Sequence, residues 1–174
     1  IRAIAISLIV FLIVSLYLYL RRGYYNIYII NKVLGSAAAI LAGITLLIGP
    51  LRSIPFVASL MTIRRQLGLL AFGFAVVHII ASLVQSERFV WFSWYLAEWI
   101  PVVAGLFAIL LWSYMTYLSR NKKIEELGVE VWKSRLSLAG KIGFLAIFIH
   151  LTVMKYPGWL RWFQGQVKQP AELA

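Results

Sequence analysis

Residues 66–83 read QLGLLAFGFAVVHIIASL, a stretch that contains no charged side chain. An apolar run of this length is enough to cross the hydrocarbon core of a bilayer as an α-helix. Four further runs of similar character flank it, at residues 3–20, 33–48, 94–118 and 136–154. The sequence therefore predicts an all-α integral membrane protein, built as a bundle of about five transmembrane helices.

The composition of the 174 residues agrees with this fold class. Hydrophobic residues make up 62% of the chain and charged residues only 13%, whereas soluble domains carry about 25% charged residues. No segment has the composition of a soluble domain and no internal repeat is visible, so residues 1–174 are predicted to form a single transmembrane domain. The aromatic and basic residues that follow Pro157 predict a short interfacial C-terminal helix.

The chain has a net charge of +11, from 17 basic and 6 acidic residues. The basic residues stand at the ends of the apolar runs, where they meet anionic lipid headgroups, so the lipid bilayer and not a nucleic acid is the expected partner. Ten of the 17 lie on the face that holds the N-terminus and the second and fourth connections. The tendency of positive charge to stay inside predicts a cytoplasmic N-terminus.

His78 and His150 are the only histidines, and each lies inside a predicted span. A titratable side chain in hydrocarbon is costly, which makes it a candidate functional residue. The two spans are separated by one return helix, so they run in the same direction. His78 follows Arg65 by 13 residues and His150 follows Arg135 by 15, which corresponds to depths of roughly 20 and 22 Å. The two histidines are therefore predicted to form a pair in the outer half of the membrane.

Two neutral imidazoles that face each other at one depth suit the iron of a bis-histidine haem. A zinc site is less favoured, because the chain has no cysteine and Glu98 is the one acidic candidate near the outer surface. For each histidine alone, the alternative is a hydrogen bond to the backbone of another helix. The matched depth favours haem, with His78 and His150 as axial ligands of the iron.

The sequence resembles the ferric reductase-like transmembrane domain family, and within it the MsrQ-like haem-binding membrane subunits. The resemblance covers residues 33–154, approximately. It rests on the order and spacing of Gly-Pro-Leu-Arg at 49–52, Arg-Arg-Gln-Leu-Gly-Leu at 64–69, His78, Trp-Lys-Ser-Arg-Leu at 132–136 and His150.

The resemblance implies a helical bundle that passes electrons through haem b, with flavin or quinone at the cytoplasmic side in some members. It also implies a redox partner protein and a bacterial inner membrane, or an equivalent energy-transducing membrane. One departure concerns the number of haems. Members of the MsrQ type carry a further histidine at the position of Ser137 in this chain, and the position one haem spacing before His78 is Arg64. A single haem is therefore expected, held by His78 and His150.

These observations predict a membrane b-type cytochrome that relays electrons through one bis-histidine haem near the outer face, to or from a partner protein. Such a chain is an electron-transfer subunit of an oxidoreductase and not a complete enzyme alone. The alternative is an accessory or structural subunit of a larger membrane complex, in which the haem is stabilising or vestigial.

Overall fold

The computed structural model describes residues 1–84 and 99–166, and helices account for nearly all of them. Within these ranges, five helical segments are long and apolar enough to cross a membrane, which confirms an all-α, multi-pass membrane protein. They are α1 (Arg2–Arg22), α2 (Ile27–Ile48), the segment Pro55–Val84, α7 (Trp99–Leu118) and α9 (Val129–Phe163). The third of them comprises α3 (Pro55–Leu60), the 3₁₀-helix η1 (Met61–Ile63) and α4 (Arg64–Val84).

Helix α2 begins six residues before the predicted start at residue 33. The side chain of Asn26 caps it by accepting a hydrogen bond from the Ile29 N–H at 3.0 Å. Such a cap satisfies one of the unpaired N–H groups of the first turn. The polar residues Asn31 and Lys32 consequently lie inside the helix and not before it.

The second and fourth connections between the predicted spans, residues 52–62 and 119–135, are largely helical. Residues 52–62 contain α3, whose first residue Pro55 suits the start of a helix because that position needs no N–H donor. Residues 119–135 contain α8 (Asn121–Leu127) and the first two turns of α9. Most of the polar side chains of this connection lie on exposed helix surface.

The residues 158–163 that follow Pro157 are helical, as predicted, but they continue helix α9 and do not form a helix of their own. Helix α9 continues through Pro157 to Phe163, a length of 35 residues. Proline removes one hydrogen bond from a helix interior, but the backbone stays helical on both sides of this residue. At 1.5 Å per residue α9 is about 52 Å long, well beyond the roughly 30 Å thickness of the hydrocarbon core.

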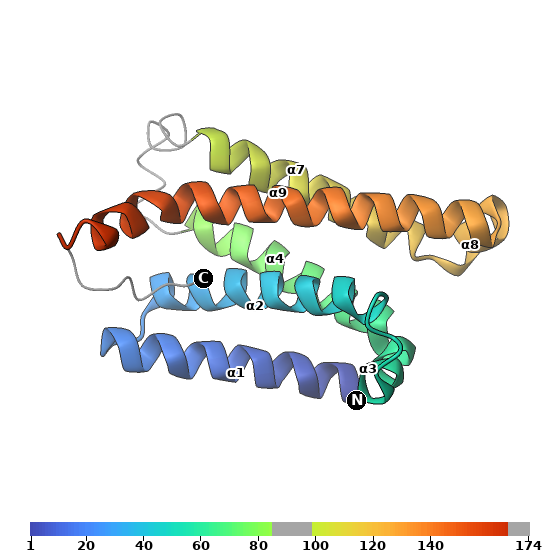
Figure 1. Cartoon of the computed structure of the whole chain (residues 1–174), viewed down its shortest axis with the longest axis horizontal. Helices are drawn as coiled ribbons and strands as arrows, with labels where there is room; N and C mark the ends of the chain where they lie inside the picture. The colour runs from blue at the N-terminus through green and yellow to red at the C-terminus, as the bar shows by residue number, and fades with distance from the viewer. Residues whose placement is uncertain (85–98, 167–174) are drawn as a thin grey trace.

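The N-terminus, α3 and α8 lie at the same end of the bundle (Figure 1). From that end α4 and α9 run in the same direction, as the single return helix between them requires. A hydrogen bond from Arg65 Nη1 to Asn121 Oδ1, 3.0 Å long, joins the start of α4 to the start of α8. The predicted gathering of the second and fourth connections on one face is therefore confirmed.

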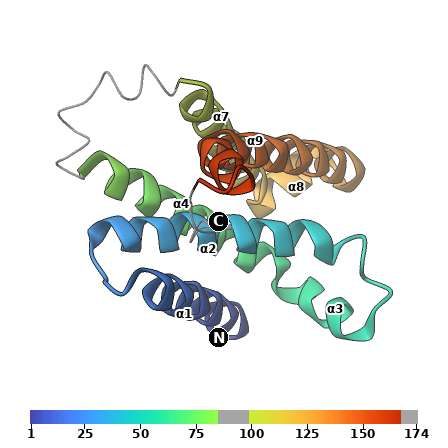
Figure 2. The same cartoon turned by 60° about the vertical axis from the view of Figure 1, so that its left-hand side comes forward.

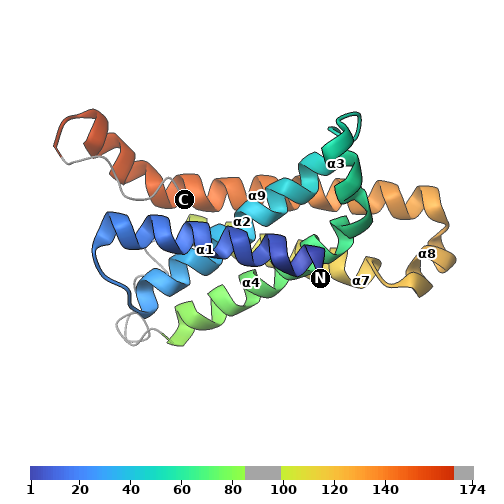
Figure 3. The same ribbon diagram turned by 90° about the horizontal axis from the view of Figure 1, so that it is seen from below.

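Helix α2 is the most buried of the five spans and packs against both α1 and α4. Figure 2 shows α7 and α9 above this group, and Figure 3 shows α1 crossing α2 on the side away from α9. The core between α1, α2 and α4 includes Leu41 and Leu67, both fully buried. In contrast Leu12 and Leu110 are 62% and 67% exposed, as expected where lipid surrounds the helices.

Candidate functional site

His78 lies on the side of α4 that packs against α2. It shares that side with Leu67, Ala71 and Ala75, the buried residues of the helix. The small alanines let the two backbones approach closely. The imidazole Nδ1 is 3.0 Å from the backbone carbonyl oxygen of Asn31. Because a carbonyl oxygen only accepts, the Nδ1–H of His78 is the donor.

The ring of His78 lies directly over Gly35, one helical turn after Asn31. A Cβ atom placed on Gly35 would be 3.0 Å from the Nδ1 and Cε1 atoms of the ring. The Asn31 side chain is also engaged, since its Nδ2 donates to Ser82 Oγ at 2.8 Å. Ser82 Oγ in turn donates to the His78 carbonyl oxygen at 2.9 Å. His78 is thus held by a small polar network within an otherwise apolar helix contact.

His150 is held in the same way on the second pair of helices. Its Nδ1 donates to the backbone carbonyl oxygen of Pro101, 2.7 Å away on α7. A Cβ atom on Gly105 would be 3.0 Å from this Nδ1. The α9 surface that faces α7 is again made of small residues, and Ala139, Gly143 and Ala146 are its buried members.

The structure places the two rings against two different helices, His78 against α2 and His150 against α7. Within the described residues, α4 and α9 do not form a closely packed pair, whereas α2 with α4 and α7 with α9 do. The direct facing of the two imidazoles at one depth stays a prediction. The backbone hydrogen bond that the sequence offered as the alternative is present at both histidines.

The hydrogen bonds to Asn31 and Pro101 decide which nitrogen carries the proton. In a neutral imidazole with a proton on Nδ1, the lone pair lies on Nε2. Metal-bound histidines in proteins almost always donate their other ring N–H to a carbonyl, a carboxylate or water. The donor set of both side chains therefore fits the axial ligands of a haem iron. Over residues 1–84 and 99–166, no group of three His, Asp or Glu side chains gathers to hold a metal ion by itself.

Residues 64 and 137, where a second haem would need its ligands, are Arg and Ser, and neither side chain binds haem iron. Arg64 Nε donates to the Thr45 carbonyl oxygen at 2.8 Å, and its guanidinium lies beside Gly49 at the end of α2. Cations are stabilised there because the last carbonyls of a helix form the negative end of its dipole. Ser137 is exposed on α9. Glu98 lies outside the described residues.

Arg64→Gln is expected to loosen the joint between the end of α2 and the start of α4. The variant loses a charge-assisted hydrogen bond to a backbone carbonyl, which contributes about 1.5 kcal/mol when it is partly shielded from solvent. Thermal unfolding in detergent measures the change. Arg52→Gln, at an exposed residue of the same connection, is the control and should leave the unfolding temperature within error. Equal effects of the two substitutions would contradict the role assigned to Arg64.

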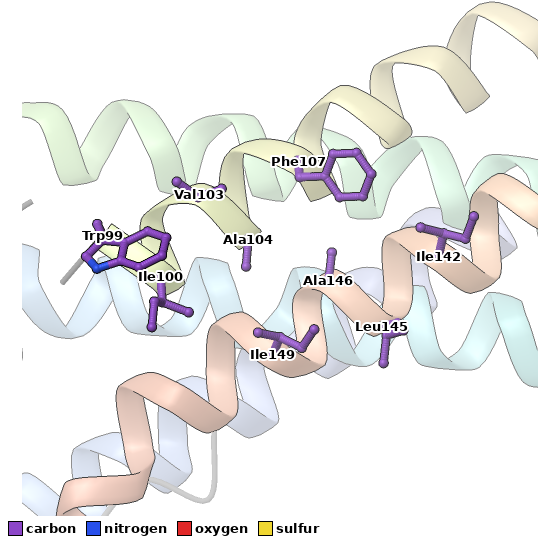
Figure 4. Close-up of a pocket in the computed structure, with 9 residues that line it drawn as sticks. All are labelled: Trp99, Ile100, Val103, Ala104, Phe107, Ile142, Leu145, Ala146 and Ile149. Atoms are coloured by element: carbon purple, nitrogen blue, oxygen red, sulfur yellow. The ribbon is translucent and has the colours of Figure 1, made fainter.

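One apolar groove of about 290 Å³ opens on the flank of the α7–α9 pair (Figure 4). Ala104 and Ala146 face each other across it, and neither histidine lines it. All of its lining side chains are hydrocarbon or aromatic, which suits contact with lipid chains. The remaining lining residues are Trp99, Ile100, Val103, Phe107, Ile142, Leu145 and Ile149.

The sequence alone did not identify four residues of this site, Asn31, Gly35, Pro101 and Gly105. Asn31 was placed before the second span, and its contribution is a backbone atom that every residue type possesses. The available signal was the spacing, since a glycine follows both Asn31 and Pro101 by four residues.

No known protein family matches this chain, and no curated protein matches it either.

Proposed function

We propose that this chain is a membrane b-type cytochrome that relays electrons through a single haem b, with His78 and His150 as the two axial ligands. The proposal rests on the position of these two side chains and on the hydrogen bonds that they make. The only two histidines of the chain both lie in membrane-spanning helices, and both donate Nδ1–H to a backbone carbonyl. With the proton on Nδ1, Nε2 is the ring nitrogen that has the chemistry of a metal ligand.

The bound haem would supply one-electron chemistry between ferric and ferrous iron. The chain's own contribution is to hold the two rings in a fixed tautomer and to surround them with hydrocarbon. With both histidines bound to it, the iron would have no open coordination site for a substrate. The proposed activity is therefore electron transfer to or from a partner and not chemistry on a bound molecule.

The proposal includes only one haem because the residues at the two positions where a second haem would need ligands, Arg64 and Ser137, do not bind haem iron. Arg64 is bonded to the end of α2, and Ser137 has no group that binds haem iron. One haem near one face does not cross the membrane, so the electron route needs a second component. In this proposal a redox partner protein exchanges electrons with the haem on the outer side, and a flavin or quinone does so on the cytoplasmic side. The membrane is a bacterial inner membrane or an equivalent energy-transducing membrane.

The reduced-minus-oxidised absorption spectrum of the purified chain tests the proposal. A low-spin b-type difference spectrum is expected, with about one haem per chain by extraction and quantification. The absence of bound haem in protein that is otherwise folded would refute the proposal. A haem that stays in one oxidation state while the partner turns over would favour the structural-subunit alternative.

A further inference from the structure

The two histidines are held by the same local arrangement, which occurs once in each helix pair. In the first pair α2 supplies the Asn31 carbonyl and Gly35, and α4 supplies His78. In the second pair α7 supplies the Pro101 carbonyl and Gly105, and α9 supplies His150. We call each carbonyl with its glycine a carbonyl–glycine cradle. In both cradles the glycine follows the carbonyl residue by four positions.

The spacing of four has a physical reason. In an α-helix every Cα–Cβ bond leans toward the N-terminus, so a side chain covers the helix surface one turn before its own position. The side chain of residue i+4 therefore covers the carbonyl of residue i. A glycine at i+4 leaves that carbonyl accessible to a group from a neighbouring helix. The positions of Gly35 and Gly105 are the ones that expose the carbonyls of Asn31 and Pro101.

Each ring lies so close to its glycine that a side chain at the glycine position would push the ring away by a few tenths of an ångström. A Cβ atom would be 3.0 Å from ring atoms of His78 at Gly35, and 3.0 Å from Nδ1 of His150 at Gly105. Other glycines of the same helices differ. At Gly43 on α2 the nearest atom is 3.5 Å away, on Phe144, and at Gly73 on α4 no atom lies within 4 Å.

We propose that Gly35 and Gly105 are positioning residues, which let each imidazole reach the backbone carbonyl of its cradle and so keep the ring proton on Nδ1. The tautomer and the ring position follow from the cradles alone. The identity of the group that Nε2 binds rests on the proposed function.

Solid-state NMR of the full chain in liposomes tests the cradles directly. Histidine is labelled with ¹⁵N, and the asparagine and proline carbonyl carbons with ¹³C. Because the chain has only two histidines, residue-type labels are sufficient. The unaltered chain should show one contact between histidine Nδ1 and an asparagine carbonyl, and one between histidine Nδ1 and a proline carbonyl. The absence of both contacts would overturn the proposal.

The variants separate the two cradles. Gly35→Ala should weaken the asparagine contact and leave the proline contact at full strength, and Gly105→Ala should weaken only the proline contact. Gly43→Ala and Gly73→Ala, which add the same methyl group where there is room for it, should leave both contacts at full strength. A glycine variant in which the contact of its own cradle is as strong as in the unaltered chain would overturn the proposal for that histidine.

If Gly35→Ala folds poorly, a double-mutant cycle on the free energy of unfolding tests the same proposal. If the added methyl group clashes only with the ring, His78→Ala in the same chain should remove most of the loss caused by Gly35→Ala. An unchanged loss in the double variant would overturn the proposal. The test of the cradles does not depend on haem binding. A chain that shows both carbonyl contacts but binds no haem would refute the proposed function and support the cradles. A chain that binds haem but shows neither contact would support the proposed function and refute the cradles.

Discussion

His78→Ala and His150→Ala are each expected to abolish the low-spin b-type spectrum of the purified protein. Each substitution removes one of the two nitrogen atoms proposed to bind the iron, and no other histidine or cysteine exists in the chain to replace it. Loss of an outer partner of a metal ligand already costs about 10–100-fold in affinity, so loss of the ligand itself should reduce haem occupancy by at least about tenfold. Absorption spectra and haem quantification give the measurement.

The matched controls are Val77→Ala and Ile149→Ala. Each alters the residue next to a histidine, at a side chain that is partly exposed to lipid, and should leave the spectrum unchanged. Circular dichroism shows whether the histidine variants keep their helical content. Added imidazole should restore part of the spectrum of His78→Gly, because a free ring can enter the space that the side chain leaves. Full haem occupancy in either alanine variant would contradict the assignment of that ligand.

Leu67→Ala is expected to destabilise the bundle more than Arg64→Gln or either histidine substitution. Leu67 is fully buried on α4 and belongs to the cluster that also contains Leu41, Ile48 and Ala71. Lipid chains are as apolar as leucine, so helices in a bilayer are held together mainly by close packing. Removing three carbon atoms from such a contact leaves a cavity, which costs about 2–5 kcal/mol.

Leu110→Ala provides the comparison for Leu67→Ala. Leu110 is 67% exposed on α7, so the same truncation removes contacts with lipid or detergent and should change stability by no more than about 0.5 kcal/mol. Thermal unfolding in detergent and resistance to proteolysis measure both variants. Equal losses would show that α2 and α4 are not joined by the contact at Leu67. Leu67 and His78 lie on the same side of α4, so the loosened contact should also weaken the bond between His78 and Asn31.

The spans and their relative directions could be predicted from the sequence, because hydropathy and length decide which segments cross a bilayer. The helix ends could not. The side chain of Asn26 starts α2 before the apolar run begins, and α9 extends on both sides of its apolar part. The polar residues at the start of α9 lie on exposed helix surface, whereas Asn31 in α2 is buried and donates a hydrogen bond to Ser82.

The two histidines could be identified because they are rare and lie in hydrocarbon, but their surroundings could not. The groups that hold them are backbone carbonyls, which every residue type has, so the sequence does not reveal them. Gly35 and Gly105 were also hidden, because glycines are common in membrane helices and the chain has 12 of them. Only the helix contacts distinguish these two glycines from Gly43 or Gly73.

The hydrogen bonds of His78 and His150 to backbone carbonyls would matter for the speed of electron transfer in the proposed cytochrome. The carbonyls of Asn31 and Pro101 belong to helix backbones, so the imidazoles are fixed to backbone atoms and not to other side chains. Ligands that are already held in place would move little when a bound iron gained or lost an electron. Under the proposed function the chain would therefore provide low reorganisation energy, the property that makes a haem site a fast electron carrier.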